Sequence, residues 1–348
     1  MRHLLAFIFI LCLSCRQNDR KPTHMDQLQI GDIKMGRFDQ DLFALDTNQL
    51  EQGLIELDKN YPKLSPLFFE QVSGMADQYD SLTPKFYEEL KLFLRDSSIR
   101  SIHELVQKNY KSTEAIEKEF HQSALYMKHY FPSLEIPNFY TLISGFTVGN
   151  FIFEDKGNRE GLGIGLEFFL GKDFNYKSLD PQNQMFSDYL TRCFNQDHLI
   201  KKTWEVWVDD KLGPEPSNRF LDYIIHRGKK LYILSRLIPE IQDTVLFEFT
   251  PAQLKWCNEN RTGIWSYFTA EQLLYNTSTL KFNKYVNPSP DSPGMPDDAP
   301  GMTGAYIGYH IIDAFMNRSK HLDIEDLIAE KDSQKILDLS KFKPKSEK

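Results

Sequence analysis

The strongest constraint on the fold is a change of residue pattern after about position 135. Residues 139–153 and 161–170 are rich in aromatic, β-branched and glycine residues, and the turn-like segment Asp-Lys-Gly-Asn at 155–158 lies between them. This arrangement is typical of a strand, a turn and a second strand. On both sides of it, apolar residues recur every three or four positions, which indicates helices. The chain is therefore expected to be α/β and mostly helical.

The spacing of apolar residues predicts the positions of the helices. They are expected at 41–61, 86–94, 102–110, 116–130, 184–193, 220–237, 303–317 and 324–339. Residues 285–302 contain five prolines and no periodicity, which indicates a long irregular loop. Gly304 and Gly308 lie four positions apart on one helix face, so we expect another backbone to approach that face closely.

The N-terminus reads as a signal for export. Met1-Arg2-His3 precedes an apolar run at 4–13, and Ser14 precedes Cys15. The run is too short for a membrane span, which needs about 20 residues. Residues 1–14 are therefore predicted to be a lipoprotein signal peptide, with Cys15 carrying diacylglycerol and fatty acyl chains such as palmitate. An ordinary signal peptide cut elsewhere is the alternative, because Cys12 stands where lipoprotein motifs usually have leucine.

The segment after the signal is polar. Residues 15–28 are expected to form a flexible tether, followed by one domain at 29–345 with a helical part at about 29–135 and a strand-containing part at about 136–345. Arg16 follows Cys15, and the absence of Asp at that position favours sorting to the outer membrane by the proteobacterial rule. The protein is expected to face the periplasm.

The charge and cysteine content of the chain bear on which kinds of molecule it could bind. The formal net charge is −8, and no stripe of Lys and Arg with interleaved aromatic residues is present, so nucleic-acid binding is not expected. No polybasic patch is present either, so membrane attachment would depend on the acyl chains. Cys193 and Cys257 could form one disulfide in an oxidising envelope, or remain free buried thiols.

A search for catalytic motifs finds no complete set. His103-Glu104 begins a zinc-hydrolase pattern, but Gln107 stands where the second histidine ligand is needed. His198 and His226 are weak metal candidates, because each has basic neighbours that repel a dication. A nucleophile elbow and a phosphate-binding glycine loop are absent from the sequence. We therefore expect no catalytic residue, no metal and no cofactor.

One further carboxylate is a candidate by position. Glu167 follows the alternating glycines of 161–165, which have the spacing of a strand and not of a dinucleotide-binding turn. It could be catalytic, although a single carboxylate on a strand is usually a residue at the rim of a sheet.

Three stretches together resemble the gliding motility lipoproteins of the GldB family of Bacteroidetes. They are Pro300-Gly301-Met302-Thr303-Gly304-Ala305-Tyr306-Ile307-Gly308, the segment 228–232 with Trp256-Cys257 and Ile264-Trp265 beyond it, and 161–173. Arg37-Phe38-Asp39 and the lipoprotein signal also fit. The resemblance implies a role in gliding motility without catalysis, in the company of other gliding or type IX secretion proteins of the envelope.

Such proteins are similar, more remotely, to zinc peptidases with a small mixed sheet and flanking helices, which implies a zincin-like scaffold. At the positions of the metal motif this chain has His198-Leu199-Ile200-Lys201-Lys202, and Arg227-Gly228 replaces a Glu-Gly pair. The resemblance thus implies a degenerate cleft, floored by 161–170, that binds an envelope protein or the cell wall. The alternatives are an active envelope zinc metallopeptidase and a solute-binding lipoprotein.

Overall fold

The computed structural model describes residues 21–22, 25–75 and 83–347. The predicted signal peptide 1–14 and Cys15 lie outside the described residues, as does most of the predicted tether 15–28. Within that tether, Met25–Gln27 forms a short 3₁₀ helix, η2, which packs against helix α6 (Glu114–Tyr130). The last residues of the tether are therefore attached to the folded domain.

The β-strands of the described chain form one mixed sheet of four strands. The strands are β1 (Met35–Arg37), β2 (Asn138–Leu142), β3 (Asn150–Glu154) and β4 (Glu160–Gly165). Their order is β1-β2-β4-β3, with β1, β2 and β4 parallel and β3 antiparallel to β4. The expected mostly helical α/β class with a small mixed sheet is confirmed.

Two strand boundaries differ from the prediction. Residues 139–153 form two strands instead of one, because a loop around Gly145, at φ 72°, separates β2 from β3. The predicted strand 161–170 ends at Gly165 and continues as the 3₁₀ helix η6 (Leu166–Phe169). The predicted turn between β3 and β4 is present and contains Gly157 at φ 67°.

The alternating glycines of β4 have a packing role. Leu162 and Ile164 are fully buried on one face of the strand. On the other face, a Cβ atom at Gly161 or Gly163 would lie 2.4 Å from a ring atom of Phe153 or Phe151, respectively. The glycines therefore leave room for the aromatic rings of β3 to lie across the sheet.

Helices make up most of the described N-terminal part of the chain. They are α1 (Phe38–Phe43), α2 (Leu50–Asn60), α3 (Leu64–Leu67) with the π turn Phe68–Val72, α4 (Pro84–Arg95), α5 (Ser97–Asn109) and α6. Thr83 caps α4 by accepting a hydrogen bond from the amide of Phe86, with Pro84 at the first helical position. The helices predicted from 41 to 130 are thus present, although the first one is divided.

Nine more α-helices are described after the sheet. They are α7 (Asp188–Thr191), α8 (Gln196–Leu212), α9 (Phe220–Leu237), α10 (Asp243–Leu246), α11 (Pro251–Ala270), α12 (Thr279–Val286), α13 (Thr303–Arg318), α14 (Ile324–Ala329) and α15 (Ser333–Ser340). The longest of them are α8, α9, α11 and α13. The expected helix at 184–193 is reduced to a 3₁₀ turn and α7, and the expected last helix is divided into α14 and α15. Residues 287–302 form the irregular loop that the prolines predict.

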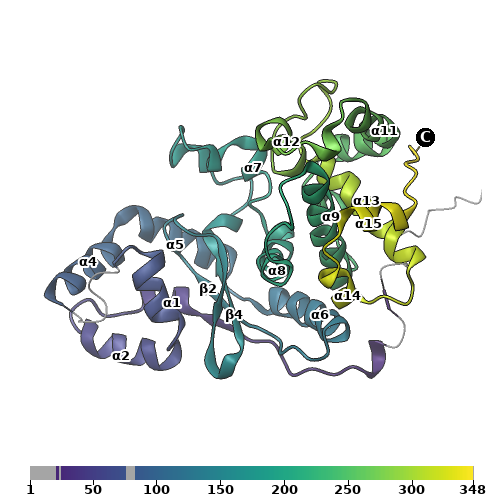
Figure 1. Cartoon of the computed structure of the whole chain (residues 1–348). Helices are drawn as coiled ribbons and strands as arrows, with labels where there is room; N and C mark the ends of the chain where they lie inside the picture. The colour runs from purple at the N-terminus through teal and green to yellow at the C-terminus, as the bar shows by residue number, and fades with distance from the viewer. Residues whose placement is uncertain (1–20, 23–24, 76–82, 348) are drawn as a thin grey trace, which may run out of the picture.

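Helices cover both faces of the sheet (Figure 1). Helix α1 contacts β2, and α8 contacts β3 and β4. Beyond α8 lies α9, which is buried along almost its whole length and packs against α13. One continuous hydrophobic core runs from Met35 to Ile336. Among the described residues, no helix has the length and apolar character needed to cross a membrane.

Helices α9 and α13 cross with their backbones in contact. A Cβ atom at Gly308 would lie 2.0 Å from the carbonyl oxygen of Ile224, and one at Gly228 would lie 2.3 Å from the carbonyl carbon of Gly308. At Gly304, a Cβ atom would lie 2.8 Å from the carbonyl oxygen of Tyr285. The close backbone approach predicted at Gly304 and Gly308 is therefore confirmed, and glycine is required because backbone atoms cannot move aside.

We predict that Gly308→Ala lowers the free energy of unfolding by about 2 kcal/mol or more, because the methyl group forces α9 and α13 apart. The matched control is Gly263→Ala, since Gly263 is an exposed glycine inside α11 with no atom within 4 Å of a Cβ position. That change should stabilise the protein by up to about 1 kcal/mol. Denaturant unfolding of both variants measures the difference, and equal stabilities would contradict the proposed role of the crossing.

Candidate functional site

The cleft between α8 and α9 is the candidate functional site. The two helices are joined by the short connection 213–219, which begins with Gly213 at φ 65° after the last turn of α8. A cavity of about 270 Å³ lies along them, and Pro288 and Met302 from the proline-rich segment form part of its other wall. The predicted motif positions 198–202 and 227–228 therefore lie on neighbouring helices. The expectation that residues 161–170 form the floor of the cleft is wrong, because α8 and α9 form its walls and no residue of 161–170 contributes to them.

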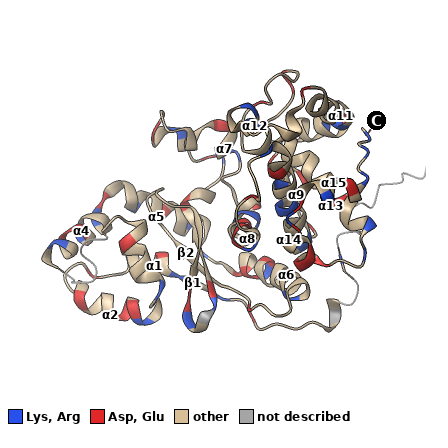
Figure 2. Ribbon diagram, viewed as in Figure 1, with Lys and Arg blue, Asp and Glu red and all other residues tan. Residues whose placement is uncertain are grey.

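A network of ion pairs forms the deepest part of this cleft. Lys201 is 2 % exposed, and its Nζ lies 3.0 Å from Oε2 of Glu205 and in contact with Oε1 of Glu248. Lys202 lies 2.6 Å from the same Glu248 oxygen, and Lys230 of α9 lies 3.2 Å from Oε1 of Glu205. Figure 2 shows residues of both signs on α8 and α9. The network therefore joins both helices to the segment before α11.

The protonation states of the network follow from this geometry. Burial opposes ionisation of Glu248, but the ammonium groups of Lys201 and Lys202 lower its pKa to about 2. The pKa of Glu205 is also held well below its ordinary value, against burial, by Lys201 and Lys202. Burial alone would lower the pKa of Lys202, but Glu248 and Glu205 raise it. Glu248, Glu205 and Lys202 are thus charged at neutral pH.

Glu248 is held in an unusual backbone conformation. Its φ is 56°, in the left-handed region that residues other than glycine, asparagine and aspartate rarely adopt. Its carbonyl oxygen accepts a hydrogen bond of 2.7 Å from Arg192, and its carboxylate pairs with Lys201 and Lys202. These contacts of the carbonyl group and of the carboxylate compensate for the backbone strain. The strained conformation brings the carboxylate next to the lysines of α8.

A second set of contacts closes the other end of the cleft. Nε2 of His226 donates a hydrogen bond of 2.8 Å to the carbonyl oxygen of Gly213, and burial lowers the pKa of this histidine. Arg227 pairs with Glu215 at 2.9 Å and donates to Oδ1 of Asn287 at 3.1 Å. His226 is thus a hydrogen-bonded structural residue, while Arg227 connects α9 to the end of α12.

The two weak metal candidates do not come together. His198 lies in the first turn of α8 with Nδ1 3.0 Å from Oδ1 of Asn195, whereas His226 bonds to Gly213, just beyond the last turn. At 1.5 Å per residue these ends of α8 are roughly 20 Å apart. Burial lowers the pKa of His198 to about 4. In the described part of the chain, no cluster of three or more His, Cys, Asp or Glu residues could hold a metal ion.

The other sequence candidates have structural environments. The ring of His103 stacks on Phe43 with centroids 4.4 Å apart. Gln107 donates a 2.9 Å hydrogen bond to Asp39, a fully buried carboxylate that also pairs with Arg37 at 2.7 Å. The segment 103–107 therefore fixes α5 to both ends of α1. Cys193 and Cys257 are both free and buried.

Glu167 was expected at the rim of the sheet, but it is fully buried in η6. Its Oε1 accepts hydrogen bonds from the amide and hydroxyl of Ser144, at 2.6 and 2.7 Å, and from the amide of Phe146 at 3.3 Å. Burial raises its pKa. Since Phe146 has φ 64°, this carboxyl stabilises the strained loop between β2 and β3.

The sequence search missed Glu205 and Glu248. Lys201, Lys202 and Glu205 have the three- and four-residue spacing of helical ion pairs, so that part of the network was visible in principle. Glu248 is 47 residues from Lys201, and no local pattern connects them.

Comparison with known proteins identifies the family. The family model described as gliding motility protein GldB matches residues 18–344. The chain belongs to the GldB family. The predicted resemblance to this family is thereby confirmed, and membership implies a role in gliding motility and a location in the cell envelope. No curated protein and no solved structure matches the chain. The similarity to zinc peptidases stays a prediction.

We predict that Glu248→Gln lowers the free energy of unfolding by about 3 kcal/mol at neutral pH, because it leaves buried Lys201 without full compensation. The low pKa of Glu248 stabilises the fold above its ordinary pKa of 4.5, and this contribution is lost as the pH falls toward 2. The difference between the variant and the wild type should therefore shrink over that range. Glu104→Gln, at an exposed position of α5, is the control and should change little.

Proposed function

We propose that this GldB-family protein is a non-catalytic lipoprotein that supports gliding by binding another protein of the gliding or type IX secretion machinery. The proposed binding site is the cleft between α8 and α9. Its lipid anchor is proposed to be Cys15, in the outer membrane with the folded domain facing the periplasm.

The observation that carries this proposal is the internal pairing of the charges in the cleft. Glu248 forms ion pairs with Lys201 and Lys202. Glu205 forms ion pairs with Lys201 and Lys230, and Glu215 forms one with Arg227. A zinc hydrolase of the kind considered as the alternative needs a carboxylate that is free to take a proton from the metal-bound water. Carboxylates whose pKa is held low by neighbouring ammonium groups are poor proton acceptors, so this cleft is better suited to binding than to catalysis.

The rival function is an active envelope zinc metallopeptidase. It requires about one zinc ion per chain and peptide cleavage that a chelator abolishes. His198 is in the first turn of α8 and His226 of α9 bonds to Gly213 beyond its last turn, and these two ends of α8 are about 20 Å apart. Lys202 and Arg227 also place cations at the positions compared with the metal motif. These observations favour the binding function, and metal analysis of the purified protein distinguishes the two.

The gliding assay tests the cleft directly. Pro288 is exposed and contributes to the wall of the cleft, so Pro288→Arg would place a long charged side chain in it. We expect a deletion strain complemented with this variant to spread poorly on a surface. Recovery of the partner by crosslinking should fall about tenfold.

Pro290→Arg is the matched control for this experiment. Pro290 lies in the same loop and is exposed, but it does not contribute to the cleft. This variant should spread like the wild type, and both variants should unfold at the same temperature. Normal spreading with Pro288→Arg would contradict the role of the cleft and leave family membership unaffected.

The anchor has its own test. Cys15→Ser removes the sulfur atom that carries the diacylglycerol, so the protein should move from the membrane fraction to the soluble fraction of the envelope. Fractionation followed by immunoblotting measures this change, and Cys12→Ser is the control that should remain membrane-bound. A Cys15→Ser protein that stays in the membrane fraction would show that attachment is not through this residue.

A further inference from the structure

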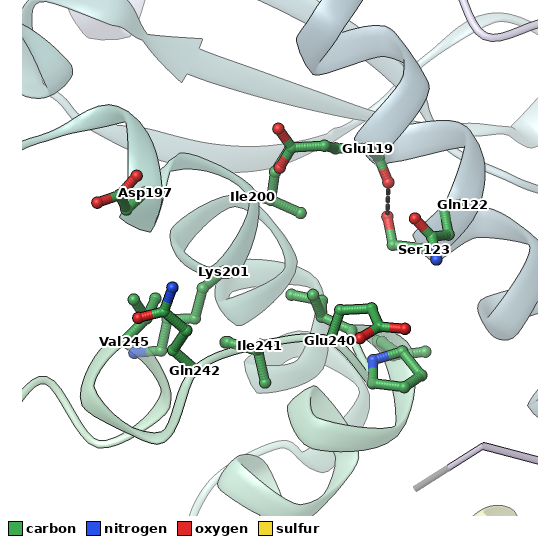
Figure 3. A pocket seen from close by; sticks show the side chains of 13 residues that line it. Glu119, Gln122, Ser123, Asp197, Ile200, Lys201, Glu240, Ile241, Gln242 and Val245 are labelled. Atoms are coloured by element: carbon green, nitrogen blue, oxygen red, sulfur yellow. Dashed lines mark hydrogen bonds between the residues drawn. The ribbon is translucent and has the colours of Figure 1, made fainter. Parts of the chain in front are cut away.

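A second cavity lies on another side of α8. It has a volume of about 290 Å³ and is bounded by α6, by the first turns of α8 and by the segment 237–245 that joins α9 to α10. Figure 3 shows side chains from all three parts around it. Lys201 contributes to the walls of both this cavity and the cleft described above.

The inner surface of the cavity is apolar. Ile200 is 5 % exposed and Ile241 is 7 % exposed, and Val245 and Leu237 also contribute to this surface. These side chains belong to the continuous hydrophobic core and are held in place by it. A bound group would therefore meet a fixed apolar surface in the interior of the cavity.

The outer part of the cavity is acidic. Glu119 from α6, Asp197 from α8 and Glu240 from the joining segment carry their carboxylates around it (Figure 3). Burial and the nearby charge of Asp197 raise the pKa of Glu119. Lys201, the cation in the wall, already pairs with Glu205 and Glu248. The outer part of the cavity therefore has more negative than positive charge.

One of these carboxylates already binds an ammonium group. Lys21, in the segment that follows the predicted lipidation site, forms an ion pair with Glu240. This contact shows that a lysine ammonium group can pair with a carboxylate at the edge of the cavity. Glu119 and Asp197 have no comparable ion pair among the described residues.

We propose that this cavity binds the side chain of an arginine or lysine presented by a partner polypeptide. The methylene groups of such a side chain would lie on Ile200 and Ile241, and its charged end would pair with Glu119 and Asp197. A divalent metal fits less well, because the carboxylates form no cluster that could coordinate one in the described part of the chain. The volume is also small for a whole cofactor.

This inference goes beyond the proposed function, because it concerns a different cavity with different residues. The cleft along α8 and α9 has its charges paired, whereas this cavity has carboxylates available for a ligand. Loss of binding here would leave the cleft experiment with Pro288→Arg unaffected. The two proposals can therefore fail independently.

The test uses the full chain in detergent and two pools of blocked nonapeptides. One pool has arginine at the centre of random flanks, and the other has citrulline, which has the same shape without the charge. We expect the protein to retain the arginine pool about three- to tenfold more strongly, with a loss of this difference in high salt. Equal retention of the two pools would overturn the proposal.

Variants locate the binding. The double change Glu119→Gln and Asp197→Asn keeps the shape of the cavity and should remove the preference for arginine. Glu56→Gln, at an exposed position of α2, changes charge elsewhere and should keep it. Thermal unfolding checks that all variants fold. An arginine preference that persists in the double variant would overturn the assignment, as would stoichiometric Ca²⁺ binding that the double variant loses.

Discussion

The crossing of α9 and α13 is the constraint on which the rest of the structure depends. Gly228 and Gly308 allow the two backbones to touch, and α9 is consequently buried on almost all sides. Since α8 packs on α9 and also on the sheet, the position of α9 determines where α8 lies. Both cavities have α8 as a wall. Two glycines, which contribute no side chain to either cavity, thus fix the geometry of both.

The buried ion network has a different relation to stability. Taking several charges out of water costs more than their attraction usually returns, so such a network is weak evidence for stability. Here it joins α8, α9 and Glu248 in one arrangement, and Glu248 adopts a strained backbone to take part. An apolar core at the same place could have several packings of similar energy. The charges favour the one arrangement in which each buried charge keeps its partner.

The sequence predicted those elements whose pattern is local. The hairpin of β3 and β4 and helices such as α4 and α13 have clear spacing of apolar residues or turns. Helix α8 was not predicted, because it is buried on several faces and includes buried Lys201, so no single apolar stripe marks it. Glu167 was expected at a rim and is buried, since its partners in the loop around Ser144 precede it by more than 20 residues. Contacts between residues far apart in the sequence determine both the burial of α8 and the burial of Glu167.

The two cavities differ in what they can recognise, although one lysine lies in the wall of both. In the cleft, Lys201, Lys202, Lys230 and Arg227 each have a carboxylate partner of the same chain. The partner that we propose would therefore gain little from charge and would fit by shape and apolar contact. In the second cavity, Lys201 pairs with Glu205 and Glu248 and leaves Glu119 and Asp197 uncompensated. The same ion pairs that neutralise one site therefore give the other its negative charge. Paired and unpaired charges distributed around a single helix can in this way give two sites of different selectivity in one protein.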